Sequence, residues 1–404
     1  MATNNNNKAL NVPHLRFPEF SGEWNKCTIN DLATVVGGGT PDTTVKSYWG
    51  GDIQWFTPSE IGKNKYVDFS LRTITRDGLD NSSAKLLPLH TILLSSRATV
   101  GECSIASNEC TTNQGFQSLI AKQCNIDFLY YLIQTKKKDL IRNACGSTFL
   151  EISANEIRKI KVAVPVQNEQ EQIAKLLSLI DERIATQNKI IEKYESLIQA
   201  MCDTLIERET QQVALSFSDF GQSYSGLSGK NAEDFGDGYP FITYMNVYQN
   251  QIIDSTDVGL VKIKETEQQS VVHYGDILFT LSSETPEEVG MGAVYLGETY
   301  PLYLNSFCFG IHITDEAKIY SPFLAYYVSS QSFRKAVYPL AQGSTRFNLQ
   351  KSDFMKKKFS FPMIEKQRKI YSILNTYSDK LIVEKQIIGL LCSQKRYLLR
   401  QLFI

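Results

Sequence analysis

A regular spacing of apolar residues marks the stretch from about 168 to 206. Gln187 is a polar residue within this series. The apolar side chains follow steps of four and three residues, at Ile173, Leu177, Ile180, Ile184, Ile191, Tyr194, Ile198, Met201 and Leu205. A heptad sustained in this way predicts a long helix that packs along another helix. At about 1.5 Å per residue this helix is roughly 60 Å long, so it needs a long partner.

The same heptad spacing recurs between Ile370 and Leu402. Pro165 and Pro362 are 197 positions apart, and at that shift Gln187 falls on Glu384. The second series is Ile370, Leu374, Tyr377, Leu381, Ile388, Leu391, Leu398 and Leu402, with Lys395 as its departure. The predicted seam of the helix pair runs through Ile180, Gln187, Ile191, Tyr377, Glu384 and Ile388. Two unrelated amphipathic helices are the alternative, but the register match extends beyond the helices.

The segments before the two helices are repeated as well. Gly146-Ser147-Thr148 matches Gly343-Ser344-Thr345 at the same shift, and the aromatic run at 127–132 has a counterpart at 322–327. Short strand-like runs alternate with turn clusters, which predicts mixed α and β units. We therefore expect an α+β protein with domains over 1–165, including an N-terminal arm, and 211–362. Long helices over 166–210 and 363–404 follow them, and Asn168 with Glu171 has the form of an N-cap pair.

Composition changes this picture little. A chain of 404 residues suits two domains plus two long helices, and 42% hydrophobic with 21% charged residues is typical of soluble proteins. No stretch approaches the ~18 apolar residues of a membrane span, and the polar start lacks a signal-peptide core. Eight cysteines occur without CxxC pairs, which indicates neither a zinc ribbon nor a disulfide framework. We expect a cytoplasmic protein without a membrane partner.

Motifs for chemistry are missing. Pro41-Asp42 is not followed within the next forty residues by the acidic-x-Lys triplet of a nuclease. Gly62-Lys63 and Gly229-Lys230 lack the leading glycine of a nucleotide-binding loop. The sequence has no Pro-Pro, which an amino-methyltransferase motif requires. The histidines show no metal-ligand spacing, and we expect structural roles for all four: His14, His90, His273 and His312. The chain is predicted to be non-catalytic, with no metal and no cofactor of its own.

Polar and aromatic residues gather instead in loops at matching places. Asn, Gln and Arg can pair with base edges, and Ser and Thr with bases or phosphates. The candidate DNA-binding residues are Thr40, Trp55, Thr57, Arg97, Asn113, Gln114, Ser147 and Thr148 in the first half. In the second half they are Thr243, Tyr244, Asn246, Ser283, Asn305, Ser344, Thr345 and Arg346. Ordinary turn chemistry is the alternative for each of them.

Two further features allow more than one interpretation. The Gly-Ser-Thr segments suit either a helix start or a turn that offers backbone N–H groups to a phosphate. The lysine triplets at 136–138 and 356–358 suit phosphate contacts or a solvated surface. The net charge of −1 gives no basic surplus, yet a basic face balanced by acidic surfaces elsewhere is compatible with it. Charge alone leaves DNA binding open.

Over essentially its whole length, the chain resembles the specificity subunit of type I restriction-modification systems. The resemblance rests on residues 13–20 with Gly22-Glu23-Trp24, on 38–41, 49–57 and 112–116, and on 241–247 and 275–278. Pro165 followed by Glu169-Gln170 matches the start of the family's spacer helices. The second copy has Lys366 in place of the glutamate. The combination with a duplicated helix is specific to the family, although no single motif is decisive.

The resemblance implies a DNA-reading subunit without chemistry of its own. Each domain is then a target recognition domain for one half of a split double-stranded DNA sequence. The two helices pair as an antiparallel coiled coil about a pseudo-two-fold axis and set the gap. Two modification subunits with S-adenosylmethionine would dock on this frame, joined by restriction subunits that use ATP and Mg. Alternatives are a self-contained restriction or modification enzyme and a coiled-coil structural protein with no DNA role. The sequence does not give the bases recognised or the gap length.

Overall fold

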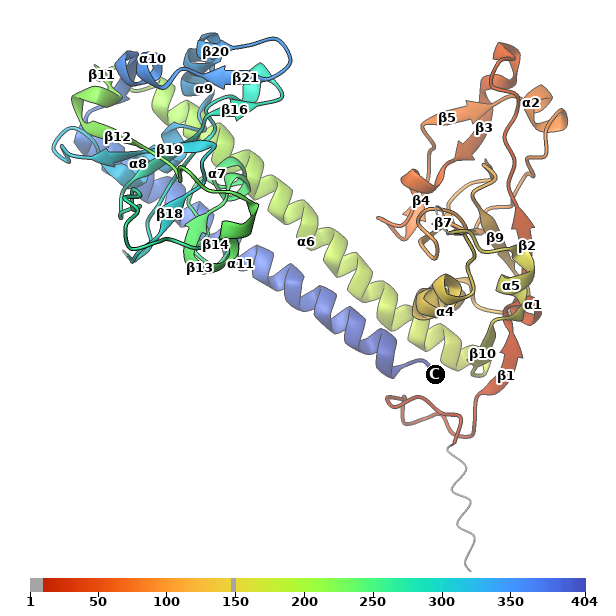
Figure 1. The fold of residues 1–404 in the computed structure, drawn as a ribbon. Coiled ribbons are helices and arrows are strands. Elements are labelled where there is room, and N and C mark those ends of the chain that lie inside the picture. Colours follow the sequence, from red (N-terminus) through yellow and green to blue (C-terminus); the bar gives the residue numbers. More distant parts are fainter. Residues whose placement is uncertain (1–9, 147–149, 299) are drawn as a thin grey trace, which may run out of the picture. The chain divides into compact units, whose positions relative to one another are not determined.

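The computed structural model of the protein describes residues 10–146, 150–298 and 300–404. The chain divides into two compact units, whose elements are labelled in Figure 1. The first unit combines 1–188 with 386–404, and the second consists of 189–385. Each of two long helices, α6 (Gln167–Glu207) and α11 (Ile364–Gln401), therefore contributes to both units. The elements before α6 are called the first domain below, and those between α6 and α11 the second domain.

The first domain is built on two sheets. Its strands are β1 (Asn25–Thr28), β2 (Ala33–Gly37), β3 (Trp49–Phe56), β4 (Tyr66–Val67), β5 (Arg72–Ile74), β6 (Ile92–Leu94), β7 (Cys103–Ala106), β8 (Cys110–Thr112), β9 (Gln117–Ala121) and β10 (Lys161–Val164). Its helices are α1 (Ile29–Leu32), α2 (Arg76–Asp80), α3 (Ile126–Thr135), α4 (Lys137–Arg142) and α5 (Ala154–Lys159), with 3-10 turns η1 (Lys46–Tyr48) and η2 (Pro58–Glu60). The larger sheet has the order β2-β9-β6-β7-β4, and the smaller one β5-β3-β8. A separate antiparallel pair joins β1 to β10.

The second domain follows the same plan. Its strands are β11 (Gln212–Ser216), β12 (Gly221–Ser225), β13 (Phe235–Ile242), β14 (Val258–Val261), β15 (Ile277–Thr280), β16 (Ser282–Ser283), β17 (Gly292–Val294), β18 (Tyr303–Leu304), β19 (Cys308–Ile313), β20 (Ala341–Gln342), β21 (Phe347–Leu349) and β22 (Lys358–Pro362). Its helices are α7 (Tyr244–Gln249), α8 (Ser321–Tyr327), α9 (Gln331–Val337) and α10 (Lys351–Lys356), with 3-10 turns η3 (Phe217–Asp219), η4 (Ala232–Asp234), η5 (Pro286–Glu288) and η6 (Tyr338–Leu340).

Strand order and register confirm the predicted internal repeat. The order β12-β19-β15-β17 reproduces β2-β9-β6-β7, and β14-β13-β18 reproduces β5-β3-β8. Strand β11 pairs with β22 as β1 pairs with β10. Within the large sheets, Tyr224 lies opposite Gly310 where Val36 lies opposite Ser118. The fold is α+β, with two mixed domains, as the sequence predicts.

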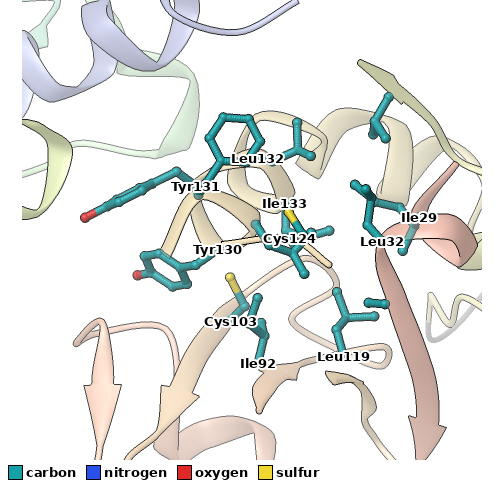
Figure 2. Close-up of a cluster of buried hydrophobic side chains, with 14 of the residues drawn as sticks. Ile29, Leu32, Ile92, Cys103, Leu119, Cys124, Tyr130, Tyr131, Leu132 and Ile133 are labelled. Carbon is teal, nitrogen blue, oxygen red and sulfur yellow. The ribbon is translucent and has the colours of Figure 1, made fainter. Parts of the chain in front are cut away.

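Each unit encloses its own apolar core. Figure 2 shows the first core, in which Ile92, Cys103 and Leu119 from the large sheet lie on the side of α3 that carries Tyr130, whereas Tyr131 points away from them. The Tyr131 hydroxyl donates a hydrogen bond of 2.7 Å to Asp181 on α6, which ties the long helix to this core. The core of the second unit is rich in phenylalanine, with Phe217, Phe279, Phe309, Phe333 and Phe354 in mutual ring contact. Aromatic burial dominates the stability of such cores.

The long helices run antiparallel, as predicted. In the first unit, Lys395 of α11 forms an ion pair of 2.7 Å with Asp181 of α6. In the second unit, Lys385 pairs with Glu195 at 2.7 Å, and Lys366 pairs with Glu209 at 3.0 Å. Later positions on α6 thus meet earlier positions on α11 within a unit. No helix in the described part of the chain is long and apolar enough to cross a membrane.

The six predicted seam positions lie on the two long helices and are at least half-buried, and their contact along one seam stays a prediction. Ile180 and Gln187 are buried, whereas the other seam positions are half-buried: Ile191, Tyr377, Glu384 and Ile388. Lys395 breaks the apolar frame because it meets Asp181 and lies 5.7 Å from the centre of the Tyr131 ring. Direct contact between Gln187 and Glu384 near the pseudo-two-fold axis stays a prediction.

The expected N-cap of the first long helix is wrong. Helix α6 begins at Gln167, so Asn168 lies inside the first turn rather than before it. The buried side chain of Gln170 organises this end instead. Its Nε2 donates to the Pro165 carbonyl at 3.0 Å, and its Oε1 accepts from the Asn125 amide at 3.0 Å. A buried amide that satisfies both sides of the junction is stronger than an exposed cap.

The second helix start repeats this arrangement. Gln367 is fully buried; its Nε2 donates to the Pro362 carbonyl at 2.8 Å, and its Oε1 accepts from the Tyr320 amide at 2.9 Å. Glu169 accepts hydrogen bonds from Arg16 and Trp24 in the first copy, whereas Lys366 takes its position in the second. The glutamine is therefore the repeated part of the Glu-Gln motif.

Candidate nucleic-acid interface

Five segments of the first domain meet at one edge, called loop edge 1: residues 38–40, 56–57, 95–99, 112–116 and 150–152. Backbone hydrogen bonds join them, from Gly39 N to Thr112 O at 2.8 Å, Asn113 N to Phe56 O at 3.0 Å, Ser96 N to Gly115 O at 2.8 Å and Ile152 N to Ser96 O at 2.9 Å. The loops are thus held as one surface that follows the ends of several strands.

The second domain has an equivalent surface, called loop edge 2: residues 226–228, 242–243, 280–283, 304–308 and 347–349. Its backbone hydrogen bonds match bond for bond, from Leu227 N to Leu304 O at 2.7 Å, Asn305 N to Ile242 O at 3.0 Å, Leu281 N to Phe307 O at 2.8 Å and Leu349 N to Leu281 O at 2.8 Å. This match fixes which residues of the two edges are equivalent.

A close backbone approach is repeated at both edges. A Cβ atom added to Gly38 would lie 2.0 Å from the Asn113 carbonyl oxygen, and one added to Gly226 would lie 2.0 Å from the Asn305 carbonyl oxygen. Real Cβ atoms do not approach backbone oxygen this closely, so both positions require glycine. The same loop geometry is therefore imposed twice.

Four of the candidate residues hold these loops. The side-chain Oδ1 of Asn113 accepts from the Gly115 amide at 2.8 Å, and that of Asn305 accepts from the Phe307 amide at 2.9 Å. Thr57 bonds to Glu60 in a capping box, and Thr243 caps α7. These equivalent pairs perform the turn chemistry that was the alternative in the sequence.

Three candidate DNA-binding residues are buried. Trp55 is 4% exposed, and its Nε1 donates to the Gly39 carbonyl at 2.9 Å. Asn246 is 0% exposed and donates to the carbonyls of Asp254 and Asp257 at 2.8 and 2.6 Å. Ser283 is 6% exposed. Burial argues against direct base contact by these three side chains, because a base edge would have to reach past the atoms that cover them.

The remaining candidates of loop edge 1 have accessible side chains. Gln114 is exposed, and its Oε1 accepts the hydroxyl of Thr40, which is half-buried. Arg97 is paired with Glu151 through contacts of 2.8 and 2.9 Å, and both side chains are largely in solvent. Ser147 and Thr148 lie outside the described residues.

At the second domain, Ser344, Thr345 and Arg346 are exposed. They lie in the turn between β20 and β21, so the helix-start interpretation of Gly343-Ser344-Thr345 is wrong. Tyr244 is half-buried, and its hydroxyl donates to the Ser282 carbonyl at 2.7 Å. Burial raises the pKa of Tyr244 above its ordinary value, which keeps this hydroxyl a donor.

The structure reveals two candidate residues that the sequence interpretation missed, Phe307 within loop edge 2 and Glu288 beside it. Phe307 is 55% exposed, and the Arg346 guanidinium lies 5.8 Å from its ring centre. Glu288 accepts a hydrogen bond of 3.1 Å from Ser283. A hydrogen bond from Tyr248 holds the pKa of Glu288 below its ordinary value, so it is a carboxylate at neutral pH. Alignment of the two copies would have revealed Phe307, which replaces Gly115.

The first domain also contains buried polar atoms without a partner. Among the described residues these are Ser96 Oγ, Thr112 Oγ1, Gln117 Oε1 and Ser118 Oγ. Two belong to loop edge 1, and the other two begin strand β9 beside it. Such groups are rare in folded proteins and need a partner. The second domain has Phe309 and Gly310 in place of Gln117 and Ser118.

The first lysine triplet is partly engaged in contacts within the first unit. Lys136 donates to the Ile404 carbonyl at 2.8 Å, and Lys137 forms an ion pair with Glu102. Lys351, which precedes the second triplet in sequence, donates to the Ser225 hydroxyl at the end of β12 at 3.2 Å. The loop edges therefore offer amide, hydroxyl, carboxylate, guanidinium and aromatic groups. This set suits hydrogen bonding and stacking against bases.

Comparison with known proteins gives a consistent answer. Residues 21–196 and 219–391 each match the family model described as type I restriction modification DNA specificity domain. Over 182 residues, or 42% of the chain, the sequence is 40% identical to the MjaIX specificity subunit of Methanocaldococcus jannaschii, a type I restriction enzyme. Over 175 residues it is 29% identical to the EcoR124I/EcoR124II specificity subunit of Escherichia coli. These alignments span 41% and 43% of the relatives' lengths.

Solved structures share the fold over nearly the whole chain. The S subunit of a type I restriction-modification system from M. genitalium aligns with 97% of the chain and 99% of its own length. Its TM-score is 0.55 at 18% identity. A chain from a structure on the assembly and conformational transition of the type I R-M system aligns with 93% of this chain and 96% of its own, with a TM-score of 0.58 at 13% identity.

Proposed function

Because the chain belongs to the family of type I restriction modification DNA specificity domains, we propose that it is the sequence-specific DNA-binding subunit of such a system. Each domain would read one half of a bipartite target through its loop edge. The observation that carries this proposal is the pair of edges with the same backbone hydrogen bonds and different accessible side chains. A repeated frame with altered side chains suits two related recognition tasks.

The difference between the edges supports two distinct half-sites. Loop edge 1 presents Gln114 and Arg97, whose side chains can pair in bidentate fashion with adenine and guanine. Loop edge 2 presents Phe307 with Arg346, and the Glu288 carboxylate lies nearby. An exposed phenyl ring suits a thymine methyl group, and a carboxylate can accept from cytosine N4. The two domains would thus recognise different bases with one loop geometry.

The long helices would set the gap between the half-sites and dock the partner subunits. Exposed apolar side chains on these helices support docking, since a partner subunit would remove them from water. They include Leu179 on α6 and Ile382, Val383 and Leu390 on α11, between 51% and 72% exposed. We propose two modification subunits, which carry S-adenosylmethionine, and restriction subunits, which use ATP and Mg. This assembly would act in the cytoplasm.

The charge balance predicts dependence on these partners. The net charge is −1, whereas phosphate neutralisation supplies much of the affinity of DNA-binding proteins. The chain alone should therefore bind DNA weakly and gain affinity and specificity with the modification subunit. Tight sequence-specific binding by the chain alone at physiological salt would contradict this.

Methylated-adenine sequencing in a host that carries the chain and its partner subunits would identify the target. A salt-titrated binding assay on that target, with and without the modification subunit, then separates the alternatives. We expect a bipartite methylated motif and specific binding only with the partner. A self-contained enzyme would modify or cleave DNA alone, and a structural coiled-coil protein would give no motif in any combination.

A further inference from the structure

The second domain contains a cluster of two histidines and an aspartate that lies outside the segments of loop edge 2. Asp276 precedes β15, His312 lies on β19, and His273 lies three positions before Asp276. Their potential ligand atoms all lie within 4.8 Å of one another. His312 Nδ1 is 2.8 Å from Asp276 Oδ1, and the two imidazole rings are 4.8 Å apart between centres. Residues far apart in sequence are thus brought to one place by the sheet.

The carboxylate of this cluster is buried and fixed. Asp276 is 2% exposed, and its Oδ2 accepts from the Tyr224 hydroxyl at 2.8 Å and from the His273 amide at 2.9 Å. Burial and the neighbouring carboxylate raise the pKa of Tyr224, so its hydroxyl remains a donor. These bonds orient the carboxylate and leave Oδ1 directed at His312. A buried carboxyl group needs hydrogen-bond partners, and His312 Nδ1 is the partner of Oδ1 among the described residues.

A glycine opposite Tyr224 leaves space for the tyrosine ring beside His312. The Tyr224 ring stacks on the His312 ring, with centres 4.2 Å apart and planes inclined by 23°. Tyr224 lies across from Gly310, where an added Cβ would come within 2.1 Å of the tyrosine ring. Glycine at 310 therefore admits the aromatic ring that orients Asp276. The Tyr224 ring covers one face of the His312 ring, and the Asp276 carboxylate bonds to its Nδ1. The His312 side chain is still 34% exposed to solvent.

We propose that His273, Asp276 and His312 bind a divalent transition cation of the zinc class. Asp276 Oδ1 and His312 Nδ1 would provide two adjacent ligands, with the cation in place of the proton that they share. A ring nitrogen of the exposed His273 would provide the third, and water would complete the sphere. Two imidazoles with one carboxylate are a ligand set that zinc, nickel and cobalt accept. Tyr224 and the His273 amide would act as the outer hydrogen bonds that orient the carboxylate.

The first domain supplies an internal comparison. By strand register and loop hydrogen bonds, Val36, Thr91 and Ile120 take the positions of Tyr224, Asp276 and His312. None of these three side chains is a ligand for a transition cation in this setting. The cluster is therefore an addition to the repeated frame rather than part of it. A bound cation would link β19 to the segment before β15, in the second domain alone.

The test is titration of the full chain with zinc chloride by calorimetry, and with cobalt chloride by absorption spectroscopy. Cys145 and Cys392 are exposed thiols that also bind these ions, so both are replaced by serine. We expect one equivalent to bind, with a cobalt spectrum free of thiolate charge-transfer bands. His273→Gln should weaken binding at least tenfold, and this exposed side chain is not needed for folding. His312→Gln should do the same. His14→Gln, which removes an exposed histidine of the first unit, should bind as the parent does.

A second measurement keeps the test independent of variant folding. The chain has four histidines, so their imidazole signals can be followed by NMR during addition of cobalt. Signals of His273 and His312 should shift or broaden at the first equivalent, before those of His14 and His90. The proposal is overturned if the parent shows no saturable binding below millimolar cation. It is also overturned if His273→Gln binds as tightly as the parent, or if other histidines respond first.

Discussion

The two domains share their backbone frame and differ in the side chains that the frame presents. Gln170 and Gln367 close the helix starts with the same hydrogen bonds, and Asn113 and Asn305 close the loops. At the equivalent loop position, however, Gly115 is buried and Phe307 is exposed. The polar residues that recur are those that satisfy backbone groups. Those that differ face the outside or fill the space between strands.

This comparison separates residues that hold the structure from residues available for recognition. A polar residue in a loop is ambiguous in one copy, since it can bond to the backbone or to a ligand. When the equivalent residue makes the same backbone bond in the second copy, its role is structural. We therefore expect specificity to depend on positions where the copies disagree and the side chain is accessible, such as Gln114 and Ser306, or Phe307 in place of Gly115.

The experiment with the largest expected effect on DNA recognition replaces an entire domain. Replacing residues 26–164 with the corresponding block of a relative should replace one half-site and leave the other unchanged. The β1–β10 pair closes the first domain before α6 begins, so the block carries all of loop edge 1. The retained long helices still supply core residues such as Ile173, Leu177 and Leu402, so the relative should match this chain at those positions. Methylated-adenine sequencing measures the result. A change in both half-sites would show that the two domains do not read independently.

The second test concerns the helices that join the two readers. Inserting four residues near Gln187 adds about 6 Å to one helix, approaching two base-pair steps of about 3.4 Å. Four residues also exceed one turn by roughly 40°, so part of the seam must adjust. We expect a longer gap with both half-site sequences unchanged. An unchanged gap with full activity would mean that the helices do not set the spacing.

The third test removes a shared structural residue. Gln170→Met should lower the free energy of unfolding by about 2–4 kcal/mol, because the Pro165 carbonyl and the Asn125 amide lose their buried partner. Gln367→Met should have a similar effect, and denaturant unfolding measures both. Gln172→Met changes an exposed residue of the same helix and should stay within about 0.5 kcal/mol. Equal effects at Gln170 and Gln172 would contradict the structural role.

The sequence predicts much of this frame. Heptad spacing gives both long helices to within a few residues, because apolar periodicity is a strong signal over many turns. The repeat gives the plan of two domains. The helix start was mispredicted, since Asn168 has the local pattern of a cap while the buried Gln170 bonds to Asn125, which is far away in sequence. The candidate site was harder still. Asn246 is of a residue type that can pair with base edges, and its burial depends on contacts that only the folded chain reveals.

The fourth test gives one domain the residue that the other domain has at a proposed DNA-contacting position. Phe307→Gly gives loop edge 2 the residue found at Gly115 and should weaken binding to the second half-site about tenfold, since base discrimination by one residue is worth about 1–3 kcal/mol. Phe307→Leu should retain part of the affinity. Leu260→Ala, at a 41% exposed apolar residue of the same domain, is the control and should have no effect. Salt-titrated binding by the complex with the modification subunit measures each variant, and equal affinity for all of them would exclude Phe307 as a reader.

The smallest expected effect concerns the ion pair of loop edge 1, which has no counterpart at Ser282 and Asn348. Arg97 and Glu151 lie 2.8 Å apart, with 43% and 44% of their side chains in solvent. An exposed pair of this kind contributes at most about 1 kcal/mol, so Glu151→Gln should leave the free energy of unfolding nearly unchanged. The same change removes a negative charge beside the proposed DNA surface and releases Arg97 from its partner. We expect roughly threefold tighter DNA binding and a log affinity that falls more steeply with log salt, by up to about 0.9 if Arg97 gains one phosphate contact. Asn348→Asp would place a carboxylate at the equivalent position of loop edge 2 and should weaken binding. If Glu151→Gln lowers affinity instead, the carboxylate positions Arg97 for DNA rather than competing with it.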